Sequence, residues 1–237
     1  MITFLFVHGG CHGAWCWERV IYNLQNLGHR GVALDLPGHG LDKTPRQNVT
    51  FNHYIEKLCE YIEEKELSNL VLVGHSLAGI ILAEVASKFP ERIQHLIYLA
   101  GFVLDEGESG IEIIPANRRP DYLNMADQSP ENSISMDFET VHWRFLNDLD
   151  REHARKIYAR LTPQPFGVYL QAASVSPSSL SQRLTYIICT NDHTMSYKLC
   201  TLLAKKLAGD TYEIESDHDA MLSHPEELTD LLIRIAV

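Results

Sequence analysis

Residues 74–79 read GHSLAG and stand between an apolar run at 70–73 and a helix-like run at 80–86. A strand that turns sharply through a serine into a helix is the context of a nucleophile elbow. The positions two before and two after the serine must be small there, because the strand and the helix pass close together. They are glycine and Ala78, where the usual pattern has glycine at both. We therefore predict that Ser76 is a nucleophile; a serine in an ordinary strand-to-helix turn is the alternative.

Six short apolar runs occur along the chain, and one of them directly precedes this turn. They are continuous rather than alternating, which is typical of parallel strands covered on both faces. The runs are 2–7, 31–35, 70–73, 95–100, 184–189 and 211–215. Helical spacing of apolar residues appears at 51–66 and 196–208, and a last helix is expected from a capping box at 223–226. This alternation predicts an α/β fold of about six parallel strands flanked by helices.

The alternation of strands and helices breaks between residues 105 and 180. This stretch has no convincing strand and one clear helical segment near 137–161. An insertion after the fourth strand would lie above the strand ends, where ligands bind in such sheets. We predict a core made of residues 1–104 and 181–237, with a mostly helical cap at 105–180. A peripheral structural insertion is the alternative.

A serine is a good nucleophile only when a base takes its proton and a third group orients that base. His218 follows the last predicted strand and precedes the last helix, so it is the candidate base. Asp192 follows the strand at 184–189 and is the preferred acid. Asp105, which follows the fourth strand, is the rival, since both carboxylates lie at strand tips. We expect Asp217, next to the histidine, to be solvated.

An oxyanion hole needs two backbone N–H groups aimed at the developing negative charge. The residue after the nucleophile, Leu77, is expected to supply one of them. The glycine-rich loop after the first strand is expected to supply the other from Gly10, because glycine lets the backbone approach a substrate closely. A tight turn that happens to be rich in glycine is the alternative for this loop.

Composition and missing motifs exclude several classes of function. The chain has 237 residues and a net charge of −11, which disfavours binding to nucleic acid or to an anionic membrane. No apolar run reaches the length of a membrane span. The sequence contains neither a phosphate-binding P-loop nor a G-x-G-x-x-G pattern, and His8 and His12 do not form an H-E-x-x-H motif. We therefore predict no metal and no cofactor.

Cysteine content bears on the compartment. The five cysteines are an odd number, and most lie in apolar contexts, which is typical of reduced thiols in a cytosolic protein. The first residues run directly into a predicted strand, with no basic segment or cleavage site typical of a signal peptide. These features predict a cytoplasmic protein.

Together these stretches resemble the α/β-hydrolase superfamily. More narrowly, they are similar to the plant methylesterase and hydroxynitrile lyase group and its bacterial esterase relatives. The matching stretches are 6–17, 35–40, 74–79, 190–192 and 217–228, in the order that this group has them. The resemblance implies a triad of Ser76, Asp192 and His218, with the N–H groups of Gly10 and Leu77 as oxyanion donors.

The resemblance also separates esterases from lyases. Lyase members carry a threonine at the position of Gly9 and a lysine at that of Asp219, and this chain has neither. His75 matches the esterases. Asp219 replaces a methionine that is common in esterases and is expected to face the pocket, where it would raise the pKa of the catalytic histidine. Gly9, His75, Asp219 and Trp143 are the predicted substrate-binding residues, and Trp15 is a further candidate for the apolar lining. Packing into the core is the alternative for both tryptophans.

The sequence therefore predicts a serine esterase that cleaves a carboxylic ester or lactone of a small, fairly apolar molecule through an acyl-enzyme. Its predicted partner is that small-molecule ester, and a homodimer is left open. One alternative is lyase chemistry, of the hydroxynitrile lyase type or another, on the same triad. The other is a binding or receptor protein that holds a small molecule with little turnover, because a fold does not fix a function.

Overall fold

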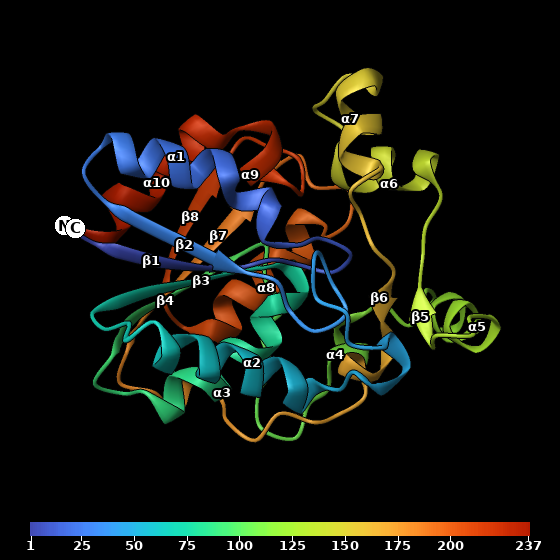
Figure 1. Ribbon diagram of the computed structural model, residues 1–237, viewed down its shortest axis with the longest axis horizontal. Coiled ribbons are helices and arrows are strands. Elements are labelled where there is room, and N and C mark those ends of the chain that lie inside the picture. The colour runs from blue at the N-terminus through green and yellow to red at the C-terminus, as the bar shows by residue number, and fades with distance from the viewer.

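The computed structural model describes residues 1–237 and contains one central sheet of six parallel strands. The strand order is β2-β1-β3-β4-β7-β8 (Figure 1). The strands are β1 (Thr3–Val7), β2 (Arg30–Leu34), β3 (Leu70–His75), β4 (Ile93–Leu99), β7 (Arg183–Cys189) and β8 (Asp210–Ile214). The six strands expected from the apolar runs are confirmed, and their ends agree to within two residues.

Helices cover both faces of this sheet. In Figure 1, α1 and α10 lie on one side of it, and α2, α3 and α8 lie on the other. The core helices are α1 (Glu18–Asn26), α2 (Phe51–Glu64), α3 (Gly79–Lys88), α8 (Tyr197–Leu207), α9 (Ala220–Ser223) and α10 (Pro225–Ala236). Single turns of 3-10 helix lie at Ala14–Trp17, Arg46–Asn48, Ser76–Ala78, Phe166–Tyr169 and Pro177–Ser179. The capping box expected at 223–226 is wrong, because His224 precedes the last helix and its side chain makes no capping bond.

Burial on both faces explains the continuous apolar runs. Side chains of a strand point alternately to opposite faces. In β1, Leu5 and Val7 belong to a cluster of 41 buried residues that includes the apolar faces of α2, α3 and α8. Phe4 and Phe6 belong to a second cluster of 20 residues, shared with α1 and α10. Both sets of side chains are therefore apolar, and no polar face appears in the strand.

Residues 105–180 fold into short elements beyond the edge of the sheet toward which β1 and β2 run (Figure 1). These are α4 (Gly110–Ile113), α5 (Arg119–Gln128), β5 (Ser133–Ile134), α6 (Phe138–Phe145), α7 (Arg151–Tyr158) and β6 (Gln164–Pro165). The two strands, of two residues each, pair antiparallel, although no strand was expected here. The single helical stretch expected at 137–161 is two helices, because Asp150 accepts bonds from the N–H groups of Glu152 and His153 and begins a new helix.

Glu84 ties the end of this segment to the core. It is buried in α3, and its carboxylate accepts hydrogen bonds from the backbone N–H groups of Ser174 (2.5 Å) and Val175 (3.1 Å) and from the Ser174 hydroxyl (2.7 Å). The bonds join residues 90 or 91 positions apart in the sequence. Hydrogen bonds to a charged group contribute more to stability than bonds between neutral groups.

We predict that Glu84→Ala destabilises the protein by about 1–3 kcal/mol, because three hydrogen bonds to a buried carboxylate are lost, and bonds to charged groups are the stronger ones. Urea unfolding of the variant and the wild type measures the change, which is expected as a lower midpoint with an unchanged slope. Glu56→Ala, an exposed glutamate in α2, is the control and should unfold like the wild type. A midpoint for Glu84→Ala equal to that of the control would contradict the role of Glu84.

Candidate active site

Ser76 occupies a strained turn at the end of β3. Its φ of 52° lies in the left-handed region, which non-glycine residues rarely adopt. Its carbonyl oxygen accepts a hydrogen bond of 2.9 Å from the N–H of Phe102, which fixes the turn. A Cβ atom on Gly79 would collide with the backbone of Phe102. The closest approach thus falls at Gly79 rather than at Ala78, and this explains why the methyl group of Ala78 is accommodated.

His218 joins Ser76 to Asp192 in a chain of buried hydrogen bonds. The Nε2 atom of His218 lies 2.9 Å from the Ser76 Oγ atom, and its Nδ1 atom lies 2.5 Å from Asp192 Oδ2. The other carboxylate oxygen of Asp192 accepts bonds from the N–H groups of Thr194 (2.6 Å) and Met195 (2.8 Å). The structure therefore brings Ser76, His218 and Asp192 together.

The rival carboxylate, Asp105, does not take part in this arrangement. Its side chain is 44% exposed, and one of its oxygens lies 3.5 Å from the Lys206 ammonium. The two strand-tip carboxylates thus have different surroundings. Only Asp192 contacts the imidazole of His218.

Opposing effects act on the pKa of His218. Burial lowers this pKa, whereas the charge and hydrogen bond of Asp192, followed by the charge of Asp219, raise it. The net direction is upward. A general base must be neutral to accept a proton, so the charge of Asp219 moves the acid limb of catalysis toward higher pH.

Gly10 and Leu77 lie beside the nucleophile, as expected for oxyanion donors. Both line the same cavity as Ser76. A residue of the segment 105–180 contacts the loop that carries Gly10. The Gln164 Oε1 atom accepts a hydrogen bond of 3.3 Å from the N–H of Cys11. Cys11 itself has a φ of 68°, so this loop makes an unusual turn immediately after Gly10.

Asp219 is fully buried and pairs with His12, so the expectation that it faces the pocket is wrong. His12 Nε2 lies 2.9 Å from Asp219 Oδ2, and His12 Nδ1 lies 2.8 Å from the carbonyl oxygen of Gly10. A carbonyl oxygen and a carboxylate both accept, so each ring nitrogen must donate, and His12 is an imidazolium. This pair bridges the loop that carries Gly10 and the loop that carries His218.

The pKa directions agree with this ion pair. Burial lowers the pKa of His12, but the charge and hydrogen bond of Asp219 outweigh it, and the net shift is upward. Burial acts to raise the pKa of Asp219, but His12 holds it below its usual value. Asp217 is also fully buried rather than solvated, and burial raises its pKa to about 7.

His75 lines the cavity, whereas Gly9 does not. The Nε2 atom of His75 donates a hydrogen bond of 3.0 Å to the carbonyl oxygen of His218. Burial lowers the pKa of His75 well below its ordinary value, so this ring is neutral. A Cβ atom on Gly9 would lie 2.7 Å from His75 Nδ1. Gly9 therefore leaves room for the imidazole, and its expected contact with substrate is wrong.

The two candidate tryptophans lie outside the cavity, so their expected role in its lining is also wrong. Trp143 is 56% exposed and packs against the ring of His193. Trp15 lies beneath the guanidinium of Arg160, with the Arg160 Cζ atom 4.4 Å from the ring centre. Neither is among the lining residues.

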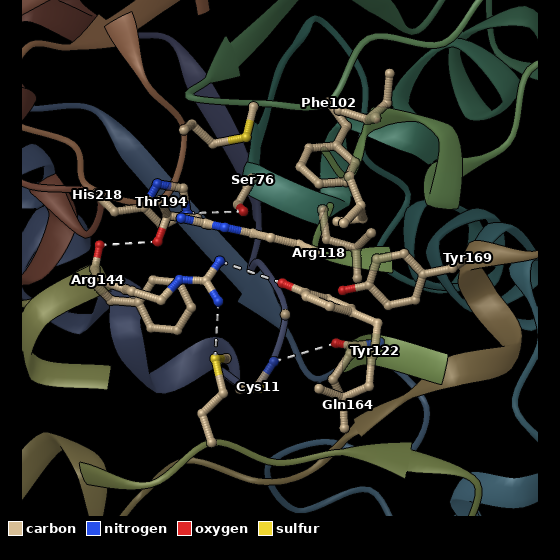
Figure 2. Close-up of a pocket in the computed structure, with 18 of the residues that line it drawn as sticks. Cys11, Ser76, Phe102, Arg118, Tyr122, Arg144, Gln164, Tyr169, Thr194 and His218 are labelled. Carbon is tan, nitrogen blue, oxygen red and sulfur yellow. Dashed lines mark hydrogen bonds between the residues drawn. The ribbon is translucent and has the colours of Figure 1, made fainter. Parts of the chain in front are cut away.

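Most residues that line the cavity were missed by the sequence reasoning. Figure 2 shows Phe102, Arg118, Tyr122, Arg144 and Tyr169 around the cavity that Ser76 lines, and Phe145 lines it as well. Five of these six come from the inserted segment 105–180, where the sequence has no periodic pattern that would indicate which side chains face inward.

Three side chains lie as close together as the ligands of a metal ion do. The ligand atoms of His75, His218 and Asp219 lie within 4.8 Å of one another. His218 already contacts Ser76 and Asp192 through its two ring nitrogens, and His75 donates to a backbone carbonyl. A metal ion bound there would compete with the contact between Ser76 and His218.

Comparison with known proteins assigns the chain to a family. A model of the alpha/beta hydrolase family matches residues 4–231. This chain belongs to that family. Salicylic acid-binding protein 2 of Nicotiana tabacum is 30% identical over 98% of this chain and 96% of its own length. Methylesterase 9 of Arabidopsis thaliana is 27% identical over 100% of this chain and 98% of its own.

Solved structures of the family have the same fold. An extracellular α/β-hydrolase from a Paenibacillus species superposes with a TM-score of 0.93 at 24% identity, over 99% of this chain and 98% of that one. A methylesterase from Arabidopsis superposes with a TM-score of 0.83 at 26% identity, also over 99% and 98%. None of the helices in the present structure has the length and apolar character needed to cross a lipid bilayer.

We predict that Asp219→Asn moves the acid limb of the profile of kcat/KM against pH toward lower pH. The variant removes a charge that raises the pKa of His218, so the neutral base persists to lower pH. The measurement is the rate of hydrolysis of one neutral ester across the pH range. Glu215→Gln, an exposed carboxylate three residues before His218, is the matched control. Superimposable profiles for Asp219→Asn and the wild type would contradict this electrostatic coupling.

Proposed function

We propose that this protein is a serine hydrolase that cleaves the carboxylic ester or lactone of a small, fairly apolar molecule through an acyl-enzyme. The observation that carries the proposal is the buried hydrogen-bond chain from Ser76 through His218 to Asp192, at the wall of a cavity. The relatives named above as methylesterases support the same type of reaction.

In the proposed reaction, Ser76 Oγ attacks the ester carbonyl while His218 Nε2 takes its proton. Asp192 holds the imidazole in the tautomer that leaves Nε2 free to accept, and it stabilises the imidazolium that forms. The N–H groups of Gly10 and Leu77 receive the oxyanion. His218 then protonates the leaving alcohol, and water, activated by the same base, releases the acid from Ser76.

One further feature of the site favours hydrolysis over lyase chemistry, and another favours it over a purely binding role. A lyase that releases cyanide needs a positive group near the leaving anion. Asp219 lies at the position where the resemblance gives lyases a lysine, and the neighbouring imidazolium of His12 is already paired with it. A protein that only binds a ligand would have no need of the strained backbone at Ser76.

We also propose that residues 105–180 act as a cap over the core formed by 1–104 and 181–237. Tyr122, Arg144 and Tyr169 of this segment line the cavity that Ser76 lines from the core. A substrate would thus lie between chemical groups from the core and recognition groups from the cap.

We propose in addition that the protein acts in the cytoplasm. All five of its cysteines are unpaired, and four of them are buried, as expected of a protein kept in a reducing compartment. Fractionation of the source cells with an antibody to this chain tests the proposal. Recovery of the protein in the culture medium or in an organelle fraction would overturn it.

We predict that Ser76→Ala abolishes ester hydrolysis and leaves the fold intact. Loss of a triad serine lowers turnover by about 10⁶-fold. Hydrolysis of a short p-nitrophenyl ester measures the loss, and a circular dichroism spectrum checks the fold. Ser87→Ala, a serine in α3 outside the cavity, is the control. Activity of Ser76→Ala near that of the wild type would rule out Ser76 as the nucleophile.

We predict that Asp192→Asn lowers kcat by about 10⁴-fold, because the imidazole loses the partner that fixes its tautomer. Asp105→Asn is the matched control, since it makes the same change at the other strand-tip carboxylate and is expected to have only a modest effect. The two values of kcat on one ester decide between them. The reverse order of effects would assign the role of the acid to Asp105.

A further inference from the structure

The cavity beside Ser76 carries two guanidinium groups and no carboxylate. Arg118 and Arg144 both line it, whereas no aspartate or glutamate does. The whole chain has 31 acidic and 20 basic residues, so its net charge is negative. The charged arginine side chains of the cavity are positive instead. A cationic lining in an acidic protein indicates a ligand that brings the missing negative charge.

Arg144 has no charged partner. Its Nη1 atom lies 3.4 Å from the Met136 sulfur, and its Nη2 atom lies 3.4 Å from the Tyr122 hydroxyl, both drawn as dashed lines in Figure 2. These are long contacts to neutral groups, and a thioether is a weak acceptor. The Nε atom of Arg144 is buried and has no acceptor at all. A guanidinium in such surroundings is strongly attracted to an anion that can accept two hydrogen bonds.

Arg118 is the second unpaired cation. In Figure 2 its side chain extends across the cavity toward the side where Ser76 and His218 are seen. It forms no ion pair and makes no hydrogen bond through its guanidinium, unlike Arg119, which donates to two backbone carbonyls. Five of the ten other arginines pair with a carboxylate, whereas Arg30, Arg92, Arg119, Arg155 and Arg234 do not. These pairs are Arg19–Glu226, Arg46–Glu131, Arg151–Glu139, Arg160–Glu18 and Arg183–Asp210.

The charge of Arg144 affects the pKa of two other groups in the site. It lowers the pKa of the buried His218 and also that of the Cys11 thiol, in each case against larger opposing effects. Two buried carboxylates near the cavity are already occupied, Asp219 by His12 and Asp192 by His218, and neither lines the cavity. The remaining lining is largely apolar, including Phe102, Ile114 and Ile134.

We propose that the natural substrate is an ester that also carries a free carboxylate, and that Arg144 and Arg118 bind this carboxylate while the ester carbonyl faces Ser76. The substrate class is thus a half-ester of a dicarboxylic acid, or an acyl ester of a hydroxy acid, with an apolar chain between its two ends. The proposal rests on the proposed function. Water cleaves the ester bond, and the carboxylate held by the arginines is unchanged by the reaction.

Matched pairs of esters test this substrate class. One series consists of monomethyl esters of dicarboxylic acids with four to eight carbons, each compared with its dimethyl ester. The other consists of acetyl esters of hydroxy acids of the same lengths, each compared with its methyl ester. In at least one series we expect kcat/KM to be about tenfold or more higher for the anionic member, as is typical of a hydrogen-bonded charge pair.

Arginine variants locate the source of any preference. Arg144→Met and Arg118→Met should each lower the ratio of anionic to neutral kcat/KM by about tenfold, and Arg144→Lys should keep part of it because the charge remains. Arg234→Met, an exposed arginine in α10, removes the same charge far from the cavity and should leave the ratio unchanged. Circular dichroism and melting temperature check that each variant is folded.

The outcomes separate this proposal from the proposed function. A wild type that prefers the neutral member in both series, or a ratio that Arg144→Met and Arg118→Met do not lower, overturns the substrate class and leaves the esterase intact. If instead no ester is hydrolysed, calorimetric titration of the Ser76→Ala variant with monomethyl adipate decides. Binding that is lost when Arg144→Met is added supports the carboxylate site. The absence of binding, or binding that Arg144→Met does not weaken, overturns it.

Discussion

The hydrogen bond between Asp192 and His218 joins the loops that follow two neighbouring strands, and the rest of the site depends on it. β7 and β8 pair in register up to Cys189 and Ile214. Two backbone bonds continue this pairing into the loops, from Thr190 N–H to Ile214 and from Asn191 N–H to Ser216. The acid and the base are thus positioned by two neighbouring strands of the sheet, and His218 Nε2 lies 2.9 Å from Ser76 Oγ.

Asp219, the residue after His218, forms a second histidine–carboxylate pair with His12. Both nitrogens of His12 face acceptors, so it is charged, whereas His75 beside it is neutral. The pair links the carbonyl of Gly10 to the residue that follows His218, and so couples the proposed oxyanion loop to the base. Because two opposite charges are buried together, their attraction offsets part of the cost of removing each from water. Removing Asp219 alone would leave His12 without its counter-charge.

The residues proposed to carry out the reaction and those proposed to recognise the substrate come from different parts of the chain. Ser76, His218 and Asp192 lie at or just beyond the ends of core strands. The groups that face them across the cavity come mainly from residues 105–180, including Arg118, Arg144 and Tyr169. A family can therefore keep one hydrolytic arrangement and change its substrates by altering the insertion. In this chain the insertion contributes two positive charges and no negative one to the cavity.

The sequence by itself determined the six strands, the elbow at Ser76 and the order of serine, acid and histidine along the chain, because these are local patterns governed by burial and by strand-to-helix turns. The tertiary structure alone decided between Asp192 and Asp105, since both follow strands and only the distance to His218 separates them. It also moved Asp219 and Trp143 out of the substrate pocket and brought in Arg118 and Arg144. A side chain's direction there depends on packing between segments far apart in sequence, as in the bond from His12 to Asp219 across 207 residues, and no local pattern encodes that contact.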